Sequence, residues 1–287
     1  MTDSNNESAN ICIVTDSTCD LPPEVVNALN IHVVPCYVNM DGSSYLDGVE
    51  ISRAEFFERL PNLAIPATTA APGVGLFEEV YRKLIENGAT KILSIHVSST
   101  LSSVMENAKV AAQNVHENII EVIDSGQLSL GLGYLVEEAA RAVKAGMQSI
   151  SIVNMIQEKI KDVFLYAVLD TLEYLRRSGR ISSLKSGLGY LLKIKPIIVV
   201  HQGEVLVEMV RTKSKAVNMV CKKIADLGNL RKISLVHGHA LDAAKSVLKS
   251  IDGFIPRNNG SFYFSEITPA IGVHVGPKAV GVICVKE

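Results

Sequence analysis

The chain has 287 residues, 47% of them hydrophobic and 20% charged, a composition that excludes a largely disordered protein and leaves room for two domains. Its formal net charge of -2 gives no overall attraction to nucleic acid or to an anionic membrane surface. No stretch resembles a secretion signal or reaches the roughly 18 apolar residues that cross a bilayer, so we expect a cytoplasmic protein without stable membrane insertion.

Strands and helices alternate in the first half of the sequence. Short apolar runs at residues 11–14, 31–38, 91–97 and 121–123 predict strands, and the apolar stripe along residues 101–115 predicts a helix that docks on a sheet. The Asp41-Gly42 pair after the second run predicts a turn into a hairpin. This alternation favours an N-terminal α/β domain over residues 10–155, with a mostly parallel sheet flanked by helices.

The pattern changes after about residue 150. Apolar runs now lie closer together, at residues 195–200, 204–211, 233–237, 261–266 and 280–285. This spacing predicts a C-terminal α/β domain over residues 156–287, with a mixed or antiparallel sheet and helices. No Gly/Ser-rich linker separates the two halves, so we expect them to pack closely and to hold a ligand between them.

Polar side chains stand where predicted strands end and helices begin. They are Asp16 and Ser17 after the first run, Thr68 and Thr69 before a helix near residue 77, and Ser98, Ser99 and Ser102 after the run at 91–97. Free N–H groups and the positive end of a helix dipole make such places suitable for an anion. The alternative is that these residues only cap their helices, as Ser and Thr commonly do.

Histidines and cysteines give no sign of a metal site. His237 and His239 lack further ligands nearby, and the five cysteines have neither CxxC spacing nor an even count, which predicts reduced thiols. His274 lies in an apolar segment, where a lone imidazole is more often a core residue than a ligand group. The Gly131-Leu-Gly133 pair does not complete a nucleotide-binding GxGxxG pattern. The sequence therefore predicts no metal and no cofactor.

A basic segment lies between Glu173 and Glu204, where no acidic residue occurs. Its cations are Arg176, Arg177, Arg180, Lys185, Lys193 and Lys195. One interpretation is an exposed loop. The other is a docking surface for an acidic partner or a phosphoryl group, which an arginine can bind through two hydrogen bonds.

Several motifs follow one another along the chain in the order of a known family. They are VTDSTCDLP at residues 14–22, Thr68-Thr69, SSTLS at 98–102, VIDS at 122–125 with GLG at 131–133, LEYLRRSGRIS at 172–182, KPI at 195–197 and GVHVGP at 272–277. In this order they resemble the DegV family, whose members include the fatty-acid-binding subunits of bacterial fatty acid kinase. The resemblance spans nearly the whole chain.

The resemblance implies a carrier of one long-chain fatty acid in a buried tunnel, not a self-sufficient enzyme. The residues that it implies for the carboxylate are Thr69, either Ser98 or Ser99, and His274, with Thr68, Ser102, Asp16 and Ser17 in supporting loops. The carrier presents the bound carboxylate to a separate ATP-dependent fatty acid kinase, which forms an acyl phosphate for phospholipid synthesis. We expect Arg176, Arg177 and Arg180 near the tunnel mouth, in contact with the kinase or the transferred phosphate.

Two other functions fit the same residues. A serine-dependent lipid ester hydrolase would use Ser98 or Ser99 with His274. A lipid-responsive interaction protein would dock a partner through the basic segment. The serines do not lie in a recognised nucleophile turn, which favours binding over catalysis.

Overall fold

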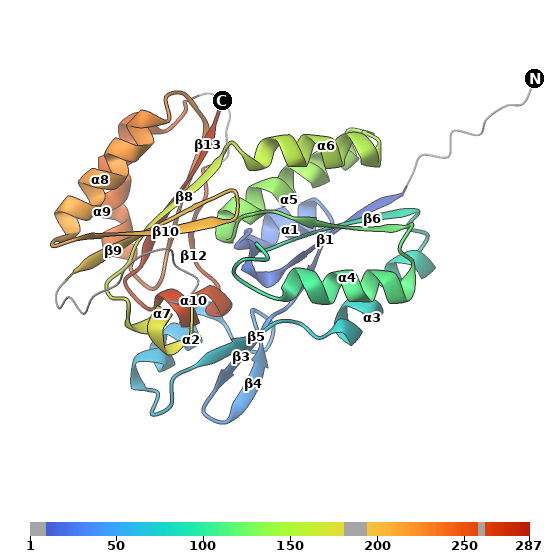
Figure 1. Ribbon diagram of the computed structural model, residues 1–287, viewed down its shortest axis with the longest axis horizontal. Helices are drawn as coiled ribbons and strands as arrows, with labels where there is room; N and C mark the ends of the chain where they lie inside the picture. Colours follow the sequence, from blue (N-terminus) through green and yellow to red (C-terminus); the bar gives the residue numbers. More distant parts are fainter. Residues whose placement is uncertain (1–9, 181–193, 258–261) are drawn as a thin grey trace, which may run out of the picture.

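Two α/β units lie side by side in the computed structural model, with a small three-stranded sheet at their lower edge (Figure 1). The structure describes residues 10–180, 194–257 and 262–287. Lys185 and Lys193 of the basic segment lie outside the described residues. Within the described ranges, none of the helices combines the length and the apolar character needed to cross a bilayer.

The first unit is built on a parallel sheet. Its strands, in order across the sheet, are β2 (Ile31–Val34), β1 (Ile11–Asp16), β6 (Lys91–His96) and β7 (Ile120–Asp124). All three strand pairs are parallel, because helices connect one strand to the next. In Figure 1, α5 (Ser129–Lys144) and α6 (Ser149–Ile160) lie above this sheet, and α3 (Val74–Glu86) and α4 (Val104–Val115) lie below it. The prediction of a mostly parallel first sheet is confirmed.

The run at residues 31–38 is two strands rather than one. Pro35 follows β2, and because proline has no N–H to donate, the ladder ends there. The chain continues as β3 (Tyr37–Met40), which pairs antiparallel with β4 (Ser43–Leu46) and β5 (Thr68–Ala70). Asp41 and Gly42 connect β3 to β4 with φ of 51° and 76°, so the predicted hairpin is confirmed.

The second unit has a mixed sheet of six strands. In order they are β10 (Glu204–Val210), β9 (Lys195–His201), β8 (Val163–Val168), β13 (Val280–Lys286), β11 (Leu230–His237) and β12 (Phe264–Glu266). The β11–β12 pair is parallel and the other four pairs are antiparallel. The predicted mixed sheet is confirmed. The predicted boundary between residues 155 and 156 falls inside α6, and its position stays a prediction.

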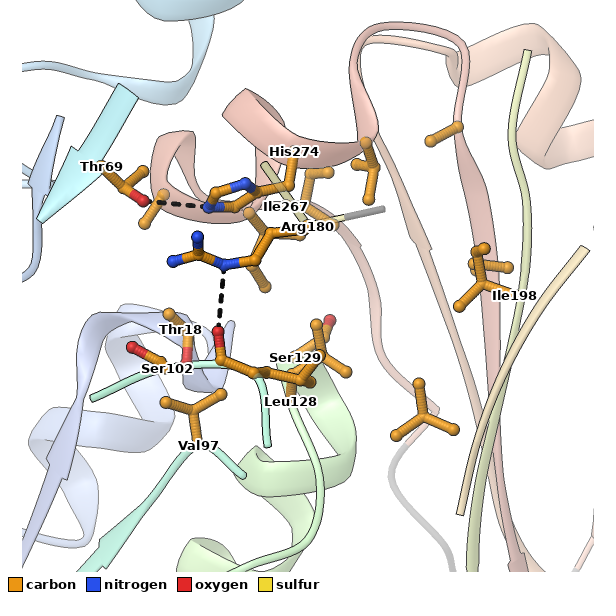
Figure 2. Close-up of a pocket in the computed structure, with 18 of the residues that line it drawn as sticks. Thr18, Thr69, Val97, Ser102, Leu128, Ser129, Arg180, Ile198, Ile267 and His274 are labelled. Atoms are coloured by element: carbon orange, nitrogen blue, oxygen red, sulfur yellow. Dashed lines mark hydrogen bonds between the residues drawn. The ribbon is translucent and has the colours of Figure 1, made fainter. Parts of the chain in front are cut away.

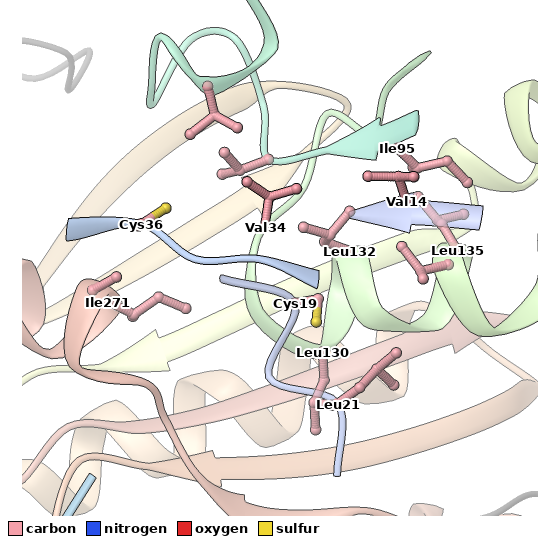
Figure 3. Packing of buried hydrophobic residues seen from close by; sticks show 14 of the residues in the cluster. Val14, Cys19, Leu21, Val34, Cys36, Ile95, Leu130, Leu132, Leu135 and Ile271 are labelled. Atoms are coloured by element: carbon pink, nitrogen blue, oxygen red, sulfur yellow. The ribbon is translucent and has the colours of Figure 1, made fainter. Parts of the chain in front are cut away.

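Helix α5 packs between the two sheets. It contacts β1 and β6 on one side and β8 and β13 on the other, which explains why its buried residues surround the helix axis. Figure 3 shows Leu132 and Leu135 against Val14 and Ile95. A Cβ atom at Gly133 would stand 2.4 Å from the carbonyl oxygen of Cys19, so the glycine pair allows close packing and is no nucleotide loop.

The remaining helices cover the outer face and the junction between the units. They are α8 (Lys213–Asp226) and α9 (Leu241–Ile251) on the second sheet, α1 (Pro23–Ala28), α2 (Arg53–Arg59), α7 (Glu173–Arg177) and α10 (Pro269–Val275), and the 3-10 turns η1 (Ser17–Cys19), η2 (Leu60–Asn62) and η4 (Asp252–Phe254). Helix α10 contacts α7, α2, β3 and β5. It therefore lies where the two units and the small sheet meet.

Candidate functional site

A cavity of about 380 Å³ lies between the two units. Its walls come from η1, β5, the loop between β6 and α4, the start of α5, the inner face of the second sheet, α7 and α10. The volume is within the range of small-molecule sites, and most of the lining side chains are aliphatic. The result is an apolar chamber with polar groups at one end (Figure 2).

The polar end is formed by Thr69 of β5 and His274 of α10. The Thr69 Oγ1 and His274 Nε2 atoms are 2.9 Å apart, within hydrogen-bond distance. The other ring nitrogen, Nδ1, is buried and has no hydrogen-bond partner. Burial, with a smaller contribution from the charge of Arg180, lowers the pKa of His274 to about 4. The ring is therefore neutral at neutral pH, and Nε2 is the atom that it presents to the Thr69 hydroxyl.

Arg180 places a positive charge in the same cavity. Its Nε donates a hydrogen bond to the carbonyl oxygen of Leu101 at 3.2 Å, and Figure 2 shows its guanidinium between His274 and Ser102. Arg176 and Arg177 do not accompany it, because both contact the carboxylate of Glu173 on the exposed side of α7. The three arginines that the sequence grouped together thus occupy two environments, and only Arg180 lines the cavity.

Of the three serines in the motif at residues 98–102, only Ser102 lines the cavity. Its Oγ accepts a 3.4 Å hydrogen bond from the backbone N–H of Val104, which leaves its own O–H free to donate. Ser98 and Ser99 lie elsewhere. The Ser98 Oγ is 2.9 Å from Thr100 Oγ1, and the Ser99 hydroxyl donates to Asp124 at 2.6 Å.

The structure therefore does not bring Ser98 or Ser99 to the Thr69–His274 pair. The physical reason is a turn after β6, in which the N–H groups of Leu101 and Ser102 donate to the carbonyl oxygen of Ser98. This turn carries the chain from Ser98 back toward the cavity at Ser102. Position in the motif alone does not show which of the three hydroxyls faces the cavity.

The expected supporting residues lie mostly behind the cavity wall. Asp16 is fully buried and accepts hydrogen bonds from the N–H and hydroxyl of Thr18, at 3.1 and 2.5 Å, and from the N–H of Val97 at 3.0 Å. Thr18 and Val97 both line the cavity, so Asp16 fixes two of its wall residues. Sequence reasoning missed Thr18, although it lies within the first motif.

Ser17 and Thr68 take no direct part in the wall. The Ser17 hydroxyl donates to Asp47 at 2.7 Å and accepts from the N–H of Cys36 at 3.1 Å. Thr68 is exposed, and its hydroxyl oxygen accepts a 3.3 Å hydrogen bond from Asn39. Ser17 thus supports the cavity wall through Cys36, whereas the Thr68 hydroxyl contacts an asparagine at the surface.

A buried Ser–His–Asp chain lies close behind the site. Ser94 Oγ is 2.7 Å from His96 Nε2, and His96 Nδ1 is 3.0 Å from Asp16 Oδ2. Although burial alone would raise it, hydrogen bonds and charge from His96 hold the pKa of Asp16 below its ordinary value. Ser94 is 0% exposed, and Tyr81 covers it with a 2.7 Å hydrogen bond, so no substrate reaches this serine. The chain of bonds is a structural support, and it does not form a hydrolase site.

The two histidines of the His237-Gly-His239 pair point to different partners. The Nδ1 atom of His237 accepts from the N–H of Ala240 at 3.3 Å, and the His239 ring lies 3.2 Å from Glu266. No group of three or more side chains able to hold a metal ion occurs in the part of the chain that the structure describes. What the cavity offers is a hydroxyl, an imidazole and a guanidinium around one polar end, a set that suits an anion.

Comparison with known proteins identifies the family. The family model described as "Uncharacterised protein, DegV family" matches residues 10–287. The chain belongs to the DegV family. A DegV domain-containing protein of Staphylococcus aureus strain COL is 34% identical over 279 residues, covering 96% of this chain and 98% of that protein.

Solved DegV structures share the fold along nearly the whole chain. A DegV family protein from Thermus thermophilus, described by its fatty acid binding, superposes with a TM-score of 0.87 at 30% identity and covers 97% of this chain and 100% of its own. DegV from Bacillus subtilis, described as a fatty acid binding protein, gives a TM-score of 0.85 at 28% identity with the same coverage. The predicted arrangement of two α/β domains is thus that of the DegV family.

Proposed function

We propose that this DegV protein binds one long-chain fatty acid in the cavity between its two units. The observation that carries the proposal is the polar end of the cavity, where the Nε2 atom of His274 lies 2.9 Å from the Thr69 hydroxyl and the cation Arg180 lines the same space. The carboxylate would be bound there, with Ser102 as a further donor. The fatty acid binding described for the relatives from Thermus thermophilus and Bacillus subtilis supports the same ligand class.

The energetics favour an aliphatic ligand with a charged head. About fifteen methylenes at roughly 0.8 kcal/mol each give about 12 kcal/mol of gross transfer free energy. That gain can outweigh the entropy cost of association, so burial of the acyl chain can drive binding. A buried carboxylate without partners would cost several kcal/mol, which explains why Arg180 and the neutral donors stand at one end.

The proposal is tested by analysing what the protein carries. We expect native mass spectrometry to show one fatty acid per chain, and an organic extract of the protein to contain that fatty acid. Thr69→Val should weaken binding of added oleic acid by about tenfold to a hundredfold, because it removes a donor to a charged group. Thr68→Val is the matched control, since Thr68 is the exposed neighbour of Thr69. A wild-type protein that retains no fatty acid from any source contradicts the proposal.

We further propose that a separate fatty acid kinase uses the loaded protein as its substrate. Family membership supports this role, and so does the position of exposed Arg176 and Arg177 on α7, the helix that ends just before Arg180. Exposed arginines can bind an acidic partner or a phosphoryl group. The hydroxyls and the imidazole would then bind the carboxylate, and the kinase would supply ATP and the catalytic groups.

The partnership is tested with loaded protein, ATP and the fatty acid kinase of the same organism. Acyl phosphate is trapped with hydroxylamine. We expect Arg177→Ala to lower its rate of formation by roughly fivefold to tenfold while fatty acid retention stays unchanged, because an exposed contact with the kinase is lost. Arg82→Ala, at an exposed arginine of α3, is the control. Equal rates for both variants contradict the contact, and no acyl phosphate with the unsubstituted protein contradicts the partnership.

A further inference from the structure

The floor of the cavity is a row of side chains across the second sheet. The strand register places Ile198 of β9, Ala167 of β8, Gly281 of β13 and Val236 of β11 opposite one another, and all four line the cavity. The two central members are the smallest. Ala167 is not fully buried although β8 is an inner strand, because its methyl group faces the empty space. The row therefore forms a trough with Ala167 and Gly281 at its bottom.

The next row on the same face is bulkier. It contains Val205 of β10, Val200 of β9 and Leu165 of β8, which also lie opposite one another and line the cavity. Two residues along a strand correspond to about 7 Å, so this row stands one step beyond the trough. Three branched side chains in line occupy more space than the alanine and glycine at the bottom of the trough.

Val205 is also part of the wall of a second pocket. That pocket lies beyond the β9–β10 turn and is lined by polar residues, among them Thr100, Asp124, Gln202 and Glu204. Val205 belongs to both linings. Val205 therefore lies where the apolar chamber adjoins this more open pocket.

The backbone around Val205 is fixed. Gln202 and Gly203 form the tight β9–β10 turn with φ of 47° and 77°. The N–H of Gly203 donates to the carbonyl oxygen of Gly126 at 2.9 Å, and the carbonyl oxygen of Gly203 accepts from Thr100 at 2.8 Å. A Cβ atom at Gly126 would stand 2.9 Å from Gly203 N, so the two segments are in close contact. The turn cannot swing away without breaking both bonds.

We propose that Val205 is the end wall of the acyl site and sets the longest chain that the protein accepts, and that the Ala167–Gly281 trough is the passage leading to it. The inference rests on the proposed function, because it assumes that the cavity holds an acyl chain with its carboxylate at His274. The methyl end of the chain lies against Val205. Removing space at the trough should shift the preference to shorter chains. Adding space at the wall should shift it to longer chains.

The test compares Val205→Ala with Val207→Ala. Val207 lies two residues along β10, belongs to the same core and is similarly buried, at 9% exposed against 6% for Val205, but it does not line the cavity. Each protein is loaded from an equimolar mixture of saturated fatty acids from lauric to arachidic acid, and the retained acids are quantified by mass spectrometry. Val205→Ala should shift the profile to longer chains, with a gain of roughly fourfold for each methylene that finds room. Val207→Ala should keep the wild-type profile.

Ala167→Val gives the opposite test. Two added methyl groups at the bottom of the trough should shift retention toward shorter chains, and this variant decides the matter if Val205→Ala does not fold. A wild-type protein that retains no fatty acid overturns the proposed function itself. A wild-type protein that retains fatty acid, with profiles unchanged in both Val205→Ala and Ala167→Val, overturns only the assignment of the wall and the passage.

Discussion

His274 combines two properties that rarely occur together, a buried ring and an unused hydrogen-bonding atom. Burial in the apolar wall and the nearby guanidinium of Arg180 disfavour the imidazolium form, so the pKa falls to about 4. In the unfolded chain a histidine titrates near 6.5. Between these two values the unfolded state binds a proton that the folded state does not bind. Stability is therefore complete above about pH 6.5 and is lost as the pH falls toward 4.

This difference predicts a pH dependence that His274→Gln removes. Between pH 7 and pH 4.5 the free energy of unfolding of the unliganded wild type should fall by roughly 2 to 3 kcal/mol more than that of the variant. Urea unfolding at several pH values measures it. Burial raises the pKa of Asp47 to about 7, which acts in the opposite direction, but this contribution is common to both proteins and cancels in the difference.

The control for this measurement is His239→Gln. The side chain of His239 is 60% exposed, so this variant separates the loss of a buried ring from the loss of any histidine. Parallel profiles for wild type and His274→Gln would show that His274 titrates normally in the folded protein, contrary to the buried, neutral ring described above.

Among the elements, α10 determines where His274 lies. The buried carboxylate of Asp20, in the first unit, holds α10 in place. Asp20 accepts a 2.7 Å hydrogen bond from the N–H of Thr268, the residue before the helix, and a 2.5 Å bond from the hydroxyl of Ser129 at the start of α5. Asp20 is 1% exposed, so each of these bonds is made away from water. The helix that carries His274 is thereby fixed to the first unit.

Sequence patterns predicted most of the strands because the signals are local. Apolar runs and turn residues predict β1, β6, β7 and the β3–β4 hairpin. The closer spacing of apolar runs after about residue 150 predicts the mixed sheet. Periodicity predicts a single strand at residues 31–38, because it does not show that a chain leaves one sheet for another at a proline. The sequence pattern also does not single out β8, although it is an inner strand of the second sheet.

The site was predictable only through the order of motifs. Thr69 and His274 are 205 residues apart, and no local pattern relates them. The difference between Arg180 and Arg177 depends on the end of α7, where Gly179 has a φ of 74° and the N–H of Arg180 donates to the carbonyl oxygen of Leu175. That left-handed residue turns Arg180 off the helix and into the cavity. Residue type and spacing alone do not predict that the backbone turns at Gly179, and so they do not predict which arginine enters the cavity.

At the scale of the whole molecule, the two units are joined by a buried ion cluster as well as by the cavity walls. Glu137 of α5 is 2% exposed and accepts hydrogen bonds from Lys232 of β11 at 2.8 Å, from Tyr263 at 2.9 Å and from Arg141 at 2.8 Å. Burial alone would raise the pKa of Glu137, but Lys232 and Arg141 hold it below its ordinary value. None of these residues lines the cavity, so the cluster acts on the packing of the units and not on the ligand.

Lys232→Met should therefore lower stability without changing which fatty acids are retained. Removing the ammonium group leaves one oxygen of Glu137 buried without its cation, which should cost about 3 kcal/mol in the free energy of unfolding measured with urea. Combining it with Glu137→Gln should recover much of the loss, because the neutral amide still accepts from Tyr263 while no charge stays buried. Arg82→Met, which breaks an exposed pair with Glu78 on α3, should cost less than about 1 kcal/mol. Equal costs for the two single variants would mean that water reaches Glu137 and that the units are joined by apolar packing alone.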